Sequence, residues 1–137
     1  MKIFLRRSLP LRIKIDVSLG ELVDKITILK IKKSKIADND KLINIEKELN
    51  SLTLSLNQLK LDGLQSLEGK LLETNTILWE IEDSIREKER SKDFGEEFIN
   101  LARAVYKTND QRFLLKSEIN QLFDSELKEV KSYESYD

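Results

Sequence analysis

The chain contains no cysteine and no histidine, and these two absences exclude several kinds of chemistry. Without cysteine there can be no disulfide, thiol nucleophile or Cys/His zinc site. Without histidine there can be no His-based acid–base relay and no Glu-x-x-His di-iron motif. No apolar run approaches the roughly 20 residues of a membrane helix, and the first apolar stretch is too short for a secretory signal. We therefore expect a cytoplasmic protein that binds no metal and no cofactor and does not associate with membranes.

The distribution of charge is uneven along the chain. Charged residues make up 36% of the 137 positions, with 24 basic and 25 acidic side chains. Residues 1–36 hold ten Lys/Arg and three Asp/Glu, whereas residues 37–137 hold fourteen and twenty-two. A basic first third and an acidic remainder are expected to pair within one chain or between two chains. The length is that of one domain with one core.

Apolar and charged residues alternate from Leu11 to Val17, which is the pattern of a half-buried strand. Residues 3–5 offer its one possible partner within the chain. Since a lone strand is marginal, residues 1–17 are predicted to form an extended or β arm. This arm would pair in a small hairpin, add to the edge of another chain, or lie over the helices.

Four later segments repeat apolar residues at spacings of three and four, which predicts helices. The first begins at a capping box, Ser18–Glu21. In this motif the serine hydroxyl and the glutamate carboxylate each accept a hydrogen bond from the other residue's backbone N–H. The second runs from Leu42 to Leu59 with the spacing of a coiled coil. Breaks at Ala37–Asp40, Asp62–Gly63 and Ser91–Gly95 separate the segments.

Short connections between long helices favour antiparallel neighbours. The predicted fold is therefore all-α, an antiparallel four-helix bundle of two helical hairpins over residues 18–125. The arm, residues 1–17, precedes the bundle, and a charged tail, residues 126–137, follows it. The third and fourth helices are expected to be longer than the first two, so the end of their hairpin would project and offer a surface for a homodimer.

The fourth predicted helix interrupts its own apolar seam. The seam is apolar at Phe98, Ala102 and Val105, polar at Asn109, Arg112 and Lys116, and apolar again at Ile119 and Phe123. A second, more apolar line on the same helix also passes through Arg112: Phe98, Leu101, Val105, Thr108, Arg112, Leu115, Ile119 and Leu122. The Arg112 side chain is therefore difficult to place in open water. A guanidinium held against a helical core must find acceptors, because a buried unpaired charge is strongly disfavoured.

A fold-back near residue 93 brings Thr74 and Asn75 level with Arg112, and it brings Glu82 near Arg103. A polar layer of Thr74, Asn75, Asn109 and Arg112 has two interpretations. It fixes the register of the helices, as a buried asparagine does in coiled coils, or it forms the floor of an anion pocket, since arginine presents a planar fork to carboxylate or phosphate.

Two sets of candidate site residues follow from these patterns. The candidate ligand-binding residues are Arg112, Asn109, Asn75, Arg103, Glu82 and Arg86, the last two spaced for an ion pair on one helix face. The candidate partner-binding residues are Lys30 and Lys33 on the first helix and Tyr133 and Tyr136 in the tail. No catalytic residue is predicted, and nucleic-acid binding is not expected because the lysine-rich helix lacks interleaved aromatics and arginines.

Four blocks of the sequence resemble a known family. They are Val17–Leu29 (VSLGELVDKITIL), Leu78–Arg86 (LWEIEDSIR), Leu101–Arg112 (LARAVYKTNDQR) and Lys131–Tyr136 (KSYESY). They resemble an uncharacterised family of small bacterial and phage proteins, classed as a domain of unknown function. The resemblance spans nearly the whole chain and implies no activity, so no catalytic residue is carried over from it.

Two functional hypotheses remain. The first is a non-enzymatic helical interaction protein, a homodimer, which docks a protein partner through its basic first helix or its tyrosine-bearing tail. The alternative is a small-anion (phosphate or carboxylate) binding protein, or an all-α enzyme similar to chorismate mutases, built around Arg112. Those enzymes hold a dicarboxylate with basic residues and a glutamate. Leu22–Lys35 is loosely similar to their first helix, with lysines where arginines are expected.

Overall fold

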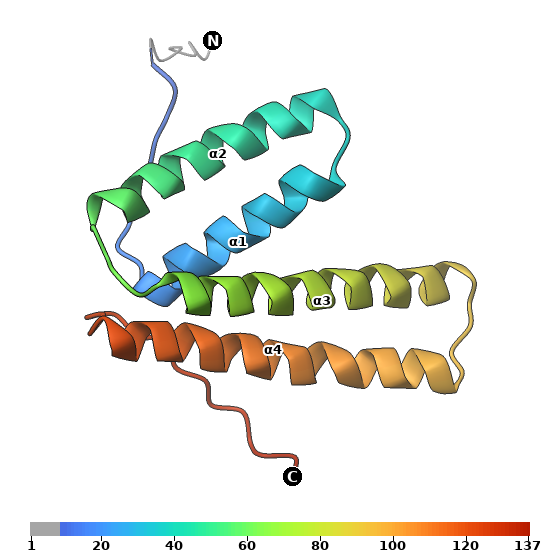
Figure 1. Ribbon diagram of the computed structural model, residues 1–137. Coiled ribbons are helices and arrows are strands. Elements are labelled where there is room, and N and C mark those ends of the chain that lie inside the picture. The colour runs from blue at the N-terminus through green and yellow to red at the C-terminus, as the bar shows by residue number, and fades with distance from the viewer. Residues whose placement is uncertain (1–8) are drawn as a thin grey trace, which may run out of the picture.

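The computed structural model describes residues 9–137, and this part of the chain contains four helices and no strand (Figure 1). The helices are α1 (Leu19–Lys35), α2 (Asn39–Gln58), α3 (Gln65–Arg90) and α4 (Glu96–Leu122). Helices α1 and α2 form one antiparallel hairpin, and α3 and α4 form the other. The predicted all-α fold is confirmed. Among the residues described, no helix is both long and apolar enough to cross a membrane.

Both helices of the first hairpin begin at a side-chain cap. Ser18 caps α1, and its Oγ accepts a hydrogen bond from the backbone N of Glu21 at 3.1 Å. Asp38 caps α2 in the same way and accepts from the backbone N of Lys41 at 3.1 Å. Both caps satisfy amides that the first turn of a helix leaves unpaired. Between α2 and α3, Gly63 takes a φ of 84°, a backbone conformation that side chains disfavour.

Helix α1 lies at the centre of the fold because two of its faces are buried. One face packs against α2 around Ile26, Leu29, Ile45 and Leu49. The other packs against the second hairpin around Val23, Leu64, Leu67, Leu71 and Ile119. Helix α2 packs mainly against α1, and α3 packs against both α1 and α4.

The second hairpin extends well beyond α1 (Figure 1). Helices α3 and α4 have 26 and 27 residues, whereas α1 and α2 have 17 and 20. The last buried side chain of α3 is Asn75, and the first of α4 is Lys116. Consequently no residue from 76 to 115 is fully buried, and at the far end of this hairpin no other helix of residues 9–137 covers α3 and α4.

The two ends of the described chain have no regular structure. Residues 9–17 form no strand, and Leu11, Ile13 and Ile15 are 64 to 77% exposed. Residues 9–17 therefore do not form the predicted strand, since no strand in the described chain pairs with their backbone. Its predicted partner, residues 3–5, lies outside the described residues. At the other end, residues 126–137 turn away from the end of α4 and pass beside that helix (Figure 1).

Candidate functional site

A buried polar layer joins α1 to the second hairpin. Gly20, Asp24, Thr27 and Ile31 recur at spacings of four, three and four, so they share one face of α1, and all four are buried. The approach is close at Gly20: a Cβ atom there would lie 2.5 Å from the backbone carbonyl oxygen of Lys116 in α4. The Gly20 amide donates to Asn120 Oδ1 at 2.7 Å. Glycine therefore allows α1 to contact the backbone of α4.

Asp24 is the acceptor at the middle of this layer. Arg112 of α4 donates from Nε to Asp24 Oδ1 at 2.8 Å and from Nη2 to Asp24 Oδ2 at 2.5 Å. The Asp24 side chain is 1% exposed and that of Arg112 is 27% exposed. This is a bidentate pair, the strongest geometry available to an arginine and a carboxylate. It supplies the acceptors that the position of Arg112 demands.

Asn75 of α3 completes the layer. Its Nδ2 donates to Asp24 Oδ1 and to Thr27 Oγ1, both at 2.9 Å. The Thr27 hydroxyl in turn donates to the backbone carbonyl of Asp24 at 2.7 Å. Asn75 Oδ1 is buried and has no hydrogen-bond partner among the described residues. The layer thus links three helices through one carboxylate.

The electrostatics keep Asp24 ionised. Burial raises the pKa of its carboxyl, but the hydrogen bonds from Arg112 and Asn75 and the charge of Arg112 outweigh that effect, and the pKa lies below its ordinary value of 3.8. The hydrogen bond to Asp24 raises the pKa of Arg112 above its ordinary value. Both groups are therefore charged at neutral pH.

A second ion-pair layer lies one helical turn further along α4. The Lys116 side chain is only 6% exposed, and its Nζ lies 2.8 Å from Glu21 Oε2 of α1 and 2.7 Å from Glu129 Oε2 of the tail. Burial lowers the pKa of Lys116, but the hydrogen bonds to Glu129 and Glu21 outweigh it, so the pKa is raised above 10.5. Lys116 is therefore a buried cation that holds two carboxylates from different parts of the chain.

The tail contacts α4 at two further points. Lys131 Nζ donates to the backbone carbonyl of Asn109 at 3.3 Å and lies 3.5 Å from Asp110 Oδ1. The Tyr136 hydroxyl donates to Asp110 Oδ2 at 2.7 Å, and its ring packs edge-on against Tyr106 with centroids 5.1 Å apart. Between the tail and α4 lies a cavity of about 830 Å³. Its lining includes Tyr106, Arg112, Phe113, Lys116, Lys131 and Tyr133.

The structure brings together three of the six candidate ligand-binding residues. Arg112 and Asn75 share Asp24, and Arg112 Nη1 lies 3.5 Å from Asn109 Oδ1. The other three lie away from this layer. Glu82 pairs with Arg86 on the surface at 3.4 Å, and the described residues show no ion pair between Glu82 and Arg103.

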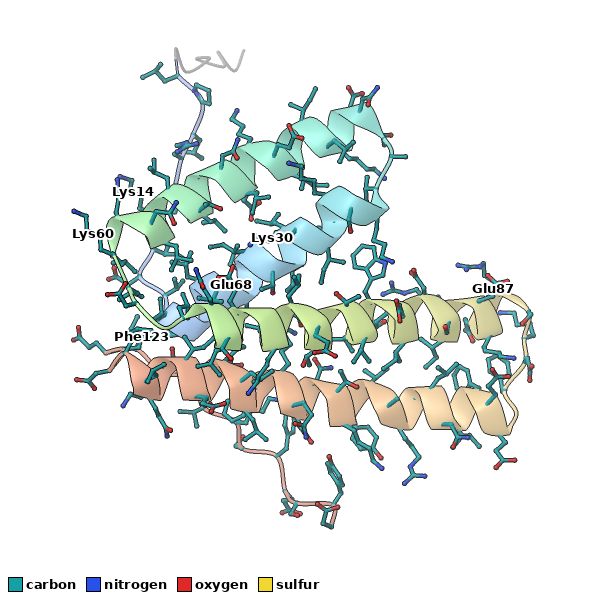
Figure 2. The ribbon with its side chains drawn as sticks, in the orientation of Figure 1. Lys14, Lys30, Lys60, Glu68, Glu87 and Phe123 are labelled. Atoms are coloured by element: carbon teal, nitrogen blue, oxygen red, sulfur yellow. The ribbon has the colours of Figure 1, made fainter. Side chains whose placement is uncertain are left out.

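The candidate partner-binding lysines are engaged within the chain. Lys30 lies 3.0 Å from Glu68 of α3 (Figure 2), and Lys33 lies 3.8 Å from Glu46 of α2. These contacts pair the basic first third with the acidic remainder inside one chain. The tyrosines differ from each other: Tyr133 is 85% exposed, whereas Tyr136 is bound to Asp110.

Sequence reasoning missed Asp24, Glu21 and Thr27 as site residues and treated Lys116 only as a break in the seam. The available signal was the second face of α1. The apolar repeat of Leu22, Ile26 and Leu29 marks the face toward α2, while Asp24 and Thr27 lie on the face toward α3 and α4. Polar residues at helical spacing on a second face of one helix, together with an arginine in the apolar seam of another helix, indicate a buried ion pair between the two helices.

The helices and the layer around Asp24 define an all-α protein whose two hairpins are joined by buried polar contacts. The chain belongs to a family of unknown function (DUF6165), whose match covers residues 13–136. This confirms the predicted membership of a family of unknown function. No curated protein and no solved structure is significantly similar to the chain.

Proposed function

We propose that this chain is a non-enzymatic helical interaction protein that self-associates through the projecting end of the α3–α4 hairpin. One observation carries this proposal: no side chain from residue 76 to residue 115 is fully buried, although both helices there carry apolar seams. A helix with an apolar stripe must bury it against another element, and two layers are the usual minimum for a stable core. The projecting end lacks a second layer.

The proposed surface lies on the same face of α4 that contacts α1. It begins where the contact with α1 ends. Arg112 and Lys116 mark that face, because both bind carboxylates of α1. Steps of three and four residues toward the start of α4 lead from them to Val105, Ala102 and Phe98, which are half-buried. This apolar line lies beyond the end of the α1 contact. A second hairpin placed on it would form four helices around a new core.

A second copy of this chain suits the surface because it brings two helices at once. A two-fold axis pairs identical surfaces with each other, and most soluble oligomers are built in this way. The hairpin is also held in shape before association. Lys88 lies 3.2 Å from Asp93 and 2.8 Å from Glu97, and the Phe94 ring packs edge-on against Phe98. A preorganised surface loses less conformational freedom on binding.

The contacts give less support to anion binding or chorismate-mutase-like catalysis at Arg112. Each cation that lines the cavity already has a carboxylate: Arg112 has Asp24, Lys116 has Glu21 and Glu129, and Lys131 has Asp110. Two of the three donor groups of the Arg112 guanidinium point at Asp24. These contacts favour a structural role for Arg112, in which it fixes how the two hairpins meet.

Sedimentation equilibrium tests self-association. We expect the wild-type chain to sediment with twice its mass of 16.0 kDa. Ala102→Glu places a charge on the proposed surface, where the monomer leaves room for it to reach water, and should give the monomer. Asn100→Glu is the matched control, because it adds the same charge at an exposed position about 160° around the same helix. It should leave the dimer intact.

Two results would overturn the proposal. A wild-type chain that is monomeric at its solubility limit removes self-association altogether. A dimer that tolerates Ala102→Glu but dissociates with Asn100→Glu places the interface elsewhere. The non-enzymatic part is tested by thermal unfolding with phosphates, nucleotides and dicarboxylates including chorismate. A ligand at 100 times its dissociation constant adds about 2.7 kcal/mol, and a shift that Arg112→Ala abolishes would favour the anion site instead.

A further inference from the structure

The tail, residues 126–137, is attached to α4 by hydrogen bonds, ion pairs, an edge-on aromatic contact and the Lys131 ammonium over the Phe113 ring. None of its residues belongs to either core cluster. Its larger apolar side chains point to solvent, since Leu127, Val130 and Tyr133 are 45%, 85% and 85% exposed. The Lys131–Asp110 pair is partly exposed and contributes little, and Lys116 keeps Glu21 as its partner when Glu129 leaves. The tail should therefore separate from α4 without unfolding the helices.

The surface beneath the tail is a groove with three distinct subsites. Lys116 Nζ binds a carboxylate, Asp110 accepts from a hydroxyl and an ammonium group, and the rings of Tyr106 and Phe113 form the walls. The Lys116 side chain is 6% exposed with the tail in place, so the carboxylate of Glu129 meets a largely desolvated cation. The groove is a built site occupied by the chain's own residues.

The occupant shows which chemistry the groove accepts. Residues 126–137 contain four acidic residues and two lysines, together with two tyrosines. Glu129 fills the cationic subsite, Lys131 and Tyr136 reach Asp110, and the Tyr136 ring packs on Tyr106. This pattern is that of an extended acidic peptide with a tyrosine at its far end.

We propose that the groove between α4 and the tail is a binding site for an extended, acidic, tyrosine-containing peptide segment of a partner protein, which the chain's own tail occupies as an intramolecular competitor. A tethered segment acts at a high effective concentration, of the order of millimolar for short flexible linkers. A partner segment therefore binds when it makes better contacts than the tail or when the tail is weakened. The groove borders the proposed hairpin surface, because Val105 lines the cavity as well, and the two sites are therefore tested with different variants.

Fluorescence anisotropy with the full-length chain tests this site. The probe is a fluorescein-labelled synthetic peptide with the sequence of residues 126–137. A chain with Glu129→Gln and Tyr136→Phe keeps the groove but loses two contacts of its own tail, and it should bind the probe roughly two- to thirtyfold more tightly than the wild-type chain. A probe that carries the same two substitutions should bind the weakened-tail chain less tightly by a similar factor.

A third variant separates the groove from nonspecific binding. Adding Tyr106→Ala to the weakened-tail chain removes an exposed wall of the groove and should reduce probe binding, whereas adding Lys107→Ala, on the next residue, should not. Equal affinity of the probe for the wild-type and weakened-tail chains would overturn the proposal. So would binding that is indifferent to the substitutions in the probe, or to Tyr106→Ala. Circular dichroism of each variant confirms that the helices are intact.

Discussion

Asp24 and Arg112, which are 88 positions apart, meet through two hydrogen bonds that join α1 to α4. The relationship explains why the apolar seam of α4 is broken. The carboxylate of Asp24 is almost completely buried, and a buried carboxylate needs a partner of opposite charge. Because the pair is bidentate, it also restricts the angle and the register at which the two helices meet. We therefore expect the polar layer to help specify how the two hairpins meet.

The first prediction concerns the loss of one member of this pair. Arg112→Met leaves Asp24 buried without its counter-charge, so we expect the free energy of unfolding to fall by about 3–5 kcal/mol. Arg112 is partly exposed, which places the loss toward the lower end of that range. Urea denaturation measures it. The double variant Asp24→Leu/Arg112→Met removes both charges and should recover most of the loss.

A control for this prediction is Arg103→Met, since Arg103 is an exposed arginine of the same helix. Its stability should stay within about 0.5 kcal/mol of wild type. If Arg112→Met is as stable as Arg103→Met, the pair contributes nothing to stability. If the double variant is no better than the single one, Asp24 does not depend on Arg112.

The second prediction concerns acid stability. The pKa of Asp24 is lower in the folded chain than its ordinary value of 3.8, so the unfolded chain binds more protons in this range and stability rises with pH. The contribution of Asp24 is complete above about pH 5 and is lost as pH falls through 3.8 toward the folded pKa. Asp24→Asn lacks this ionisation. Urea denaturation across this range should show the stability gap between wild type and Asp24→Asn closing as pH falls, and a constant gap contradicts the assignment.

The third prediction concerns the close approach of α1 to α4. Gly20→Ala places a Cβ atom 2.5 Å from the Lys116 carbonyl oxygen, and a backbone atom cannot move aside without shifting a helix. We expect a loss of about 1–3 kcal/mol, the usual cost of overpacking. Gly69→Ala is the matched control, because its Cβ would meet nothing within 4 Å. That change should instead stabilise α3 by about 0.5–1 kcal/mol. Thermal unfolding of the two variants should therefore shift in opposite directions, and a shift in the same direction contradicts the close approach.

The sequence was sufficient for the helices because their signals are local. The serine cap at Ser18 and the turn residues at Asp62–Gly63 act within a few positions, and both appear where the pattern indicates. The other half of the predicted capping box is not formed in the described chain, since the Glu21 carboxylate binds Lys116 instead. The unusual position of Arg112 could also be recognised, since it requires only the periodicity of one helix. Its need for an acceptor follows from the cost of burying a charge.

The partner of Arg112 could not be predicted in the same way. Asp24 lies on a second buried face of α1, and that face becomes evident only when α1 is known to lie between α2 and the α3–α4 hairpin. The approximate register of α3 and α4 brought Asn75 to the correct layer but suggested a contact between Glu82 and Arg103, whereas Glu82 pairs with Arg86. The tail contacts depend on the path of residues 126–137, which have no periodic pattern to fix it.

The last prediction concerns the attachment of the tail. The hydrogen bond to Asp110 raises the pKa of the Tyr136 hydroxyl from 10.0 to about 12, and the negative charge of Asp110 adds to this effect. In a Tyr106→Phe/Tyr133→Phe background, tyrosinate absorbance reports Tyr136 alone. Adding Asp110→Asn should move the pKa of Tyr136 back toward 10.0, because the amide carries no charge to oppose ionisation. Asp83→Asn removes an exposed carboxylate of α3 and should leave the titration unchanged. A pKa near 10.0 with Asp110 intact would mean that the tail does not rest on α4 in solution, and the groove would then be open to an external peptide without competition.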